Sequence, residues 1–269
     1  MRRLPVWPIA ALLAGAVFLP FLGAPGLVDP WEPHYAEVSR QMLLRSDWVH
    51  PWWREAGFFS KPPLVLWGGA AGLALLGEGA AEWAVRLPVA LAAVLGVAVS
   101  AEAVARLAAR RAGLLAAAAL ATSPVVALLA RQAIPDAPFA LLSTAGGLAL
   151  AVALLDDAAG RGWATAGWIL LAFATLAKGP LGFLLPAGAL LAWLVVTGDW
   201  RRAPRLAPVE RVAGVPVPVG PVAFLAIAVP WYAAMAAWPG RDESGWTFVQ
   251  RFWLYDHLRR FGPGAHVPV

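Results

Sequence analysis

The sequence predicts an all-α membrane protein whose chain crosses the bilayer several times. Of its 269 residues, 60% are hydrophobic and only 14% are charged, whereas soluble domains carry about a quarter charged residues. The mean hydropathy is +0.67. The hydrophobic residues gather in long runs, and a helix needs roughly 20 of them to cross a bilayer. We therefore expect a single transmembrane module, residues 1–269, without a soluble domain.

Eight apolar runs are candidate spans. They cover residues 4–23, 62–77, 87–107, 112–130, 137–155, 163–177, 180–197 and 217–237. If all of them crossed, the arginines at 106–111 and 201–211 would lie outside, although short arginine-rich loops usually stay in the cytoplasm. The run at 62–77 is the weakest, because it begins with two prolines, contains several glycines and is short. We predict that it does not cross, which leaves about seven spans.

This assignment gives a consistent topology. The first span, 4–23, is interpreted as retained and not as a cleaved signal peptide, so the N-terminus is cytoplasmic. Residues 24–86 form an external loop, six further spans lie within 87–237, and residues 238–269 form an external tail. We expect the connection 206–221, rich in proline and valine, to be irregular.

The remaining composition excludes some chemistry. The chain contains no cysteine, so disulfides and thiolate metal sites are excluded. A net charge of +5 could suggest nucleic acid. The basic residues lie mostly in short clusters between apolar runs, however, and topology explains them better. We expect membrane lipids as partners and no nucleic acid.

The long first loop carries a predicted helix within residues 29–49. One side of it presents Tyr35, Val38 and Met42, and the other presents Glu37, Arg40 and Gln41. Tryptophans crowd around this segment, which is typical of a membrane interface. We expect the helix to lie half immersed on the outer surface.

Charged residues of this loop are the first site candidates. Asp29 and Glu32 could act as a general base or bind a cation, although a simple helix cap also explains Glu32. Lys61 precedes two prolines at the membrane surface. It suits a phosphate headgroup, and snorkelling to the interface is an equally simple interpretation.

Two more candidates lie at predicted helix ends. Asp136 stands between two prolines and should begin a helix. Lys178 precedes Gly179 and Pro180 and should end one. Either could be only a helix-terminal charge.

The tail is dense in polar residues. Arg259 and Arg260 suit bidentate binding of phosphate or pyrophosphate. His257 could be a general acid or base, a metal ligand, or a hydrogen-bonded interface residue. Together these residues suggest an external site for an anionic amphiphile without naming a reaction.

Four stretches in order resemble the aminoarabinose transferase and protein O-mannosyltransferase group, membrane glycosyltransferases of the GT-C fold. They are residues 29–42 (DPWEPHYAEVSRQM), 58–63 (FFSKPP), 131–136 (RQAIPD) and 176–180 (LAKGP). Several motifs in the right order are more specific than any one alone. The resemblance implies a GT-C-type helix bundle with juxtamembrane helices in the first loop.

The resemblance also implies an activity. A sugar on a polyprenyl phosphate would be transferred to an acceptor on the periplasmic face of the cell inner membrane. A first-loop carboxylate would assist the acceptor, which could be a lipid, a protein or another glycan. Lys61, Arg259 and Arg260 would bind the donor phosphate and stabilise the leaving group. Tyr35 and Glu37 belong to the same motif.

This sequence departs from the family pattern at several positions. Trp31 stands where many members have aspartate, so Asp29 or Glu32 would have to serve, and we favour Asp29. Ser60 stands where some members have a metal-binding glutamate, so we assign no metal. Phe58 replaces a tyrosine. Family members continue beyond the position of Val269, so we expect a C-terminal truncation.

Two other functions compete with the enzyme. One is a non-catalytic polyprenyl-phosphate binder or assembly partner of a full-length transferase, which the changes at Trp31 and Ser60 favour. The other is a transporter. It ranks last because charges within the spans are scarce and no inverted repeat is visible.

Overall fold

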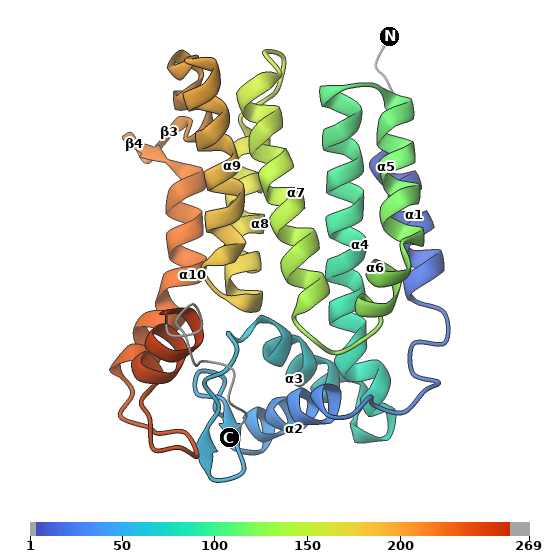
Figure 1. Ribbon diagram of the computed structural model, residues 1–269, viewed down its shortest axis with the longest axis vertical. Coiled ribbons are helices and arrows are strands. Elements are labelled where there is room, and N and C mark those ends of the chain that lie inside the picture. Colours follow the sequence, from blue (N-terminus) through green and yellow to red (C-terminus); the bar gives the residue numbers. More distant parts are fainter. Residues whose placement is uncertain (1–3, 259–269) are drawn as a thin grey trace.

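The computed structural model describes residues 4–258 as an elongated helix bundle (Figure 1). Helices α1, α4, α5, α7, α8, α9 and α10 run along the long axis, while α2 and α3 lie at one end. The helices are α1 (Trp7–Phe18), α2 (Trp31–Leu44), α3 (Leu64–Leu76), α4 (Ala81–Leu107), α5 (Arg110–Thr122), α6 (Pro124–Leu129), α7 (Asp136–Leu155), α8 (Gly162–Lys178), α9 (Leu181–Thr197) and α10 (Val219–Ala237). The fold is therefore the predicted all-α bundle.

Short elements occupy the two ends of the bundle. The first loop adds the hairpin β1 (Trp52–Trp53) and β2 (Ala56–Gly57), and the 3-10 turn η1 (Glu78–Ala80) leads into α4. At the opposite end lie the 3-10 helix η2 (Trp200–Leu206) and the hairpin of β3 (Val209–Val212) and β4 (Val215–Pro218). A π-helical segment, Val249–Leu258, follows α10.

Within residues 4–258, three helices are long and apolar enough to cross a membrane. They are Glu78–Leu107, Asp136–Leu155 and Val219–Ala237, and shorter apolar helices cover Trp7–Phe18, Leu64–Leu76 and Leu181–Thr197. Helix α3 has 13 residues and extends only about 20 Å at 1.5 Å per residue. That is less than the roughly 30 Å hydrocarbon core of a bilayer. The predicted exclusion of this segment from the spans stays a prediction.

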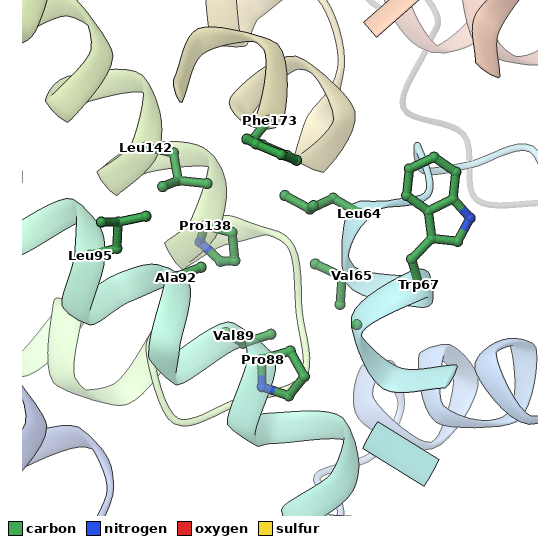
Figure 2. Close-up of a pocket in the computed structure, with 11 residues that line it drawn as sticks. Leu64, Val65, Trp67, Pro88, Val89, Ala92, Leu95, Pro138, Leu142 and Phe173 are labelled. Atoms are coloured by element: carbon green, nitrogen blue, oxygen red, sulfur yellow. The ribbon is translucent and has the colours of Figure 1, made fainter. Parts of the chain in front are cut away.

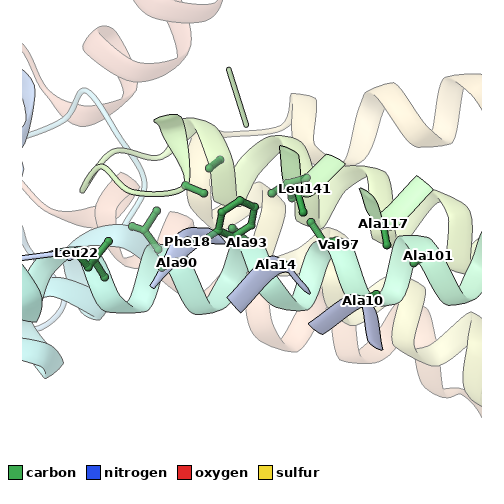
Figure 3. Close-up of a cluster of buried hydrophobic side chains, with 14 of the residues drawn as sticks. Ala10, Ala14, Phe18, Leu22, Ala90, Ala93, Val97, Ala101, Ala117 and Leu141 are labelled. Carbon is green, nitrogen blue, oxygen red and sulfur yellow. The ribbon is translucent and has the colours of Figure 1, made fainter. Parts of the chain in front are cut away.

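Small side chains hold the long helices close together. The largest buried cluster joins α1, α4, α5 and α7 through residues such as Ala10, Ala14, Ala93 and Val97 (Figure 3). Where lipid surrounds a bundle, packing of small residues drives helix association, because lipid tails remove the hydrophobic advantage of burial. The alanine-rich runs of the sequence therefore also specify close interhelical packing.

The α7–α8 pair fixes a register that matters for the site. Gly146 and Gly167 face each other so closely that a Cβ on either would lie 3.0 Å from the carbonyl oxygen of the other. The two helices follow one another through a short turn and run antiparallel. Counting outward from the glycine pair brings the first residue of α7, Asp136, beside the last residue of α8, Lys178.

Most local predictions agree with the structure. Tyr35, Val38 and Met42 are buried on one side of α2, and α7 begins at Asp136 while α8 ends at Lys178, as predicted.

The prediction of an irregular connection at 206–221 is wrong. Strands β3 and β4 pair there in an antiparallel hairpin. Its two turn residues, Ala213 and Gly214, have φ values of +51° and +84°. Two positive φ values in succession give the turn whose twist matches paired strands, and the valines on either side favour strand.

Candidate functional site

An ion pair joins the helix ends at the first-loop end of the bundle. Lys178 Nζ donates to Asp136 Oδ1 at 2.5 Å, and Nζ lies 5.8 Å from the centre of the Phe139 ring. The two side chains are 36% and 39% exposed. They are therefore accessible to a ligand, and surface pairs of this kind are weak enough to exchange partners.

Tyr35 faces this ion pair from helix α2. Burial, together with the negative charge of Asp136, raises the pKa of the Tyr35 phenol to about 12. The side chain is only 7% exposed. Tyr35 therefore keeps its proton near neutral pH and can donate a hydrogen bond.

His257 lies against the end of α8. A Cβ at Gly179 would lie 2.8 Å from His257 Nε2, and Gly179 has a φ of +110°, so only glycine fits between the two segments. His257 Nδ1 is 2.6 Å from the carbonyl oxygen of Phe252. A carbonyl can only accept, so Nδ1 carries the proton and Nε2 of the neutral ring is an acceptor. The structure thus brings His257 next to Lys178.

Lys61 lies just before α3. Its Nζ donates to the carbonyl oxygen of Ser60 at 3.0 Å. The neighbouring Phe59 is fixed by edge-to-face contacts with Trp238 and Phe248, at ring-centre distances of 5.6 and 5.9 Å. Lys61 and Lys178 are the only lysines in the sequence. Both belong to this end of the bundle, whereas every other basic residue is arginine.

An apolar cavity of about 350 Å³ lies between α3, α4, α7 and α8 (Figure 2). Its walls come from α3 (Leu64, Val65, Trp67, Gly68), α4 (Pro88, Val89, Ala92, Leu95), α7 (Pro138, Leu142) and α8 (Phe173). The lining begins three residues after Lys61 and two residues after Asp136. Apolar walls and cationic groups thus belong to the same helix ends, which suits an amphiphile with an anionic head.

Glu32 does not lie in this group. It forms a buried bidentate ion pair with Arg86, whose Nε and Nη2 donate to the two Glu32 oxygens at 2.8 and 2.7 Å. The amides of Val28 and Ala133 donate to the same carboxylate at 2.8 and 2.6 Å. Burial acts to raise the pKa of Glu32, but the hydrogen bonds from Arg86 and the two amides lower it overall.

The prediction of Glu32 as a catalytic carboxylate therefore needs correction. Glu32 is 1% exposed, and both of its carboxylate oxygens already accept hydrogen bonds. The acceptor of the sugar therefore cannot reach this carboxylate. Arg86 also donates to the carbonyl oxygens of Leu22, Pro25 and Gly26. We assign the pair a structural role, in which it ties the start of the first loop to α4 and to the segment before α7.

The other first-loop carboxylates are accessible. Asp29 is exposed immediately before α2, so an acceptor could reach it. Glu37 is on the side of α2 away from the buried face. There it pairs with Arg40 at 2.8 Å and accepts from Gln41 at 2.7 Å. The hydrogen bond from Arg40 lowers the pKa of Glu37 despite partial burial, which leaves it an ionised surface residue.

The remaining predictions concern the two arginines of the tail and a metal site. Arg259 and Arg260 lie outside the described residues. Across residues 4–258, no group of three histidine, aspartate or glutamate side chains is placed to hold a metal ion, and Ser60 supplies no carboxylate beside Lys61.

The sequence analysis missed Arg86. A lone arginine one residue before the apolar run 87–107 was an available signal, because a charge at that depth requires a partner. The predicted external loop, residues 24–86, ends at this arginine, and its partner Glu32 lies 54 residues away.

Comparisons with known proteins identify the family of this chain. Residues 60–232 match the family described as dolichyl-phosphate-mannose-protein mannosyltransferase. The chain is 31% identical to an undecaprenyl phosphate-alpha-4-amino-4-deoxy-L-arabinose arabinosyl transferase of Pseudomonas aeruginosa, and 28% identical to one of Edwardsiella ictaluri. Each match covers 97% of this chain and 45% of the relative.

Solved structures show the same fold. ArnT from Cupriavidus metallidurans bound to undecaprenyl phosphate superimposes with a TM-score of 0.78 at 30% identity, and its apo state with 0.76 at 31%. These matches cover 94% of this chain and 44% of ArnT. The chain thus spans less than half the length of these relatives. Because the family match extends over more than half of this sequence, the chain belongs to the dolichyl-phosphate-mannose-protein mannosyltransferase family, whose GT-C bundle it shares with ArnT.

Proposed function

We propose that this chain carries the donor-binding side of a glycosyltransferase that moves a sugar from a polyprenyl-phosphate carrier to an acceptor. The reaction would take place on the external face of the cell inner membrane, with the N-terminus in the cytoplasm. The relatives named above act on an undecaprenyl-phosphate-linked sugar, and one related structure holds undecaprenyl phosphate.

The observation that carries the proposal is an apolar cavity between α3, α4, α7 and α8, at the end of the bundle where α3 begins after Lys61 and α8 ends at Lys178. Its walls offer a hydrocarbon surface to one end of the isoprenoid chain. Lys61 lies at the start of α3 and Lys178 at the end of α8, and each can bind a phosphate oxygen. A ligand with one long apolar part and one anionic head matches both features at once.

The chemistry then follows from charge. The acceptor attacks the anomeric carbon, the bond from that carbon to the phosphate oxygen breaks, and the polyprenyl phosphate leaves with the bonding electrons. Lys61 and Lys178 stabilise the negative charge that develops on the departing phosphate, with Arg259 and Arg260 as further phosphate ligands. On donor binding, the phosphate replaces Asp136 as the ion-pair partner of Lys178. The uncharged Tyr35 hydroxyl donates a hydrogen bond to the phosphate.

The acceptor loses a proton in this reaction. Asp29 is exposed at the start of α2 and is our choice for the base. His257 Nε2, beside Lys178, is a second group that can take up this proton. A non-catalytic donor-lipid binder is the alternative function, since Trp31 occupies a position where many family members carry aspartate.

The first experiment measures binding. Native mass spectrometry of the purified chain should detect a bound polyprenyl phosphate, added or co-purified, and Lys61→Ala should retain at least ten-fold less. That loss corresponds to a hydrogen bond to a charged group, worth about 1.5–3 kcal/mol. The matched control is Arg241→Ala, an exposed cation at the same end of the bundle whose side chain donates to Gly245. Equal retention by wild type and Lys61→Ala would refute the donor site.

A second measurement separates the enzyme from the binder. Transfer of a radiolabelled sugar from the same carrier should depend on Asp29. A protein that binds the lipid but gives no transfer in wild type or in Asp29→Asn would be the binder.

A further inference from the structure

Three turns lie at the end of the bundle opposite α2 and α3 (Figure 1) and make it strongly basic. Its turns, residues 106–111, 156–161 and 199–211, carry eight arginines and four acidic residues. No lysine occurs there, so every cation presents a guanidinium group, which binds phosphate oxygens in pairs. This surface is remote from the proposed donor site.

Part of this charge is already neutralised. Asp157 accepts from Arg202 at 3.1 Å and also pairs with Arg205, and Arg106 pairs with Asp156 at 3.0 Å. Arg201 is different, because its side chain is 98% exposed and its distance to Asp199 is 3.8 Å.

Arg211 lies exposed on β3, next to Glu210. Arg201 belongs to η2, which ends at Leu206, and β3 begins three residues later at Val209. Both exposed arginines therefore lie at this end of the bundle and are accessible to anions from outside the protein.

The hairpin β3–β4 adds an apolar tip to this basic surface. Val212 pairs with Val215 across the turn, and these side chains are 53% and 58% exposed. The hairpin is tied to the bundle because Arg161 Nη1 donates to the Val209 carbonyl at 3.3 Å, and Trp168 Nε1 donates to that of Leu206 at 2.7 Å. These two bonds tie the base of the hairpin to the bundle beside Arg161.

We propose that the β3–β4 hairpin, together with Arg201 and Arg211, is an anchor for anionic phospholipids of the adjacent leaflet. The valines of the tip insert at the boundary between headgroups and acyl chains, and the two guanidinium groups bind headgroup phosphates. A combination of exposed apolar side chains and flanking arginines is what an anionic bilayer surface attracts. Three of the four acidic residues, Asp156, Asp157 and Asp199, pair with other arginines. Eight arginines against four acidic residues leave this end positively charged.

The test measures lipid preference. The purified chain is mixed with equal amounts of phosphatidylglycerol and phosphatidylcholine, and native mass spectrometry counts the copies of each that stay bound. Because one arginine near an anionic surface contributes about five-fold, R201Q/R211Q should lower the phosphatidylglycerol preference by about five- to twenty-five-fold. R201K/R211K keeps the charge and should keep most of the preference.

Two further variants make the test specific. V212S/V215S should also weaken phosphatidylglycerol retention, because it removes the apolar tip and leaves the charge. The control R54Q/R241Q removes two arginines at the opposite end and should leave the preference unchanged. Equal preference in wild type and R201Q/R211Q, or an equal loss in R54Q/R241Q, would overturn the proposal. Polyprenyl-phosphate retention by R201Q/R211Q should equal that of wild type, so this result is independent of the donor site.

Discussion

Replacement of Glu32 by alanine tests the structural role assigned to the buried ion pair. The change removes both carboxylate contacts of Arg86 and the acceptor of two backbone amides, those of Val28 and Ala133. Arg86 would keep its three carbonyl contacts but would lose its counter-charge while 1% exposed. Removal of one partner from a buried pair costs about 3–5 kcal/mol. We expect a loss of this size in the free energy of unfolding.

The assay is equilibrium unfolding in mixed micelles, followed by tryptophan fluorescence. Glu37→Ala is the matched control, since Glu37 lies on the same helix and pairs with Arg40 in a half-exposed position. A surface pair contributes about 0–1 kcal/mol, so this variant should unfold close to wild type.

Arg86→Ala and the double variant complete the test. If the pair acts as a unit, Arg86→Ala should be destabilised as much as Glu32→Ala. The double variant should then lose clearly less than the two single losses together. A Glu32→Ala protein that unfolds within 1 kcal/mol of wild type, yet has lost transfer activity, would refute our reasoning and restore Glu32 as a catalytic residue.

Three further predictions use the same structure. The pKa of Glu32 is lowered in the folded state. Its contribution to stability is therefore present above the ordinary pKa of 4.5 and is lost as the pH falls toward the folded-state pKa. In melting experiments at different pH values, the difference in stability between wild type and Glu32→Ala should narrow below about pH 4.5. Gly72→Ala should destabilise the chain by about 1–3 kcal/mol, because its Cβ would lie 1.9 Å from a backbone oxygen of α4. Gly79 has open space around it, so Gly79→Ala should melt like wild type. Equal melting temperatures of the two variants would contradict this packing. The amines that an amine-reactive reagent can modify are Lys61, Lys178 and the N-terminus. Bound polyprenyl phosphate should reduce the modification of both lysines, as measured by peptide mass mapping. Unchanged labelling of the lysines would place the phosphate elsewhere.

Much of the fold, including the helix ends that carry Asp136 and Lys178, followed from local sequence signals. The start of α7 at Asp136 and the end of α8 at Lys178 were predictable, because proline and glycine act on the backbone within a turn of their own position. The buried face of α2 was predictable from its helical period. The hairpin β3–β4 was not, since two turn residues with positive φ include an alanine, which rarely adopts that conformation.

The sequence by itself determined the class of protein, the ends of its central helices and the grouping of its arginines in the turns between helices, because composition, periodicity and caps are local properties. Only the tertiary structure decided which of the charged residues meet. The glycine contact between α7 and α8 sets Asp136 against Lys178, and the packing of α4 against the first loop sets Glu32 against Arg86. A carboxylate looks the same in sequence whether it is exposed or paired in the interior. Its role depends on partners that only chain packing brings within hydrogen-bonding distance.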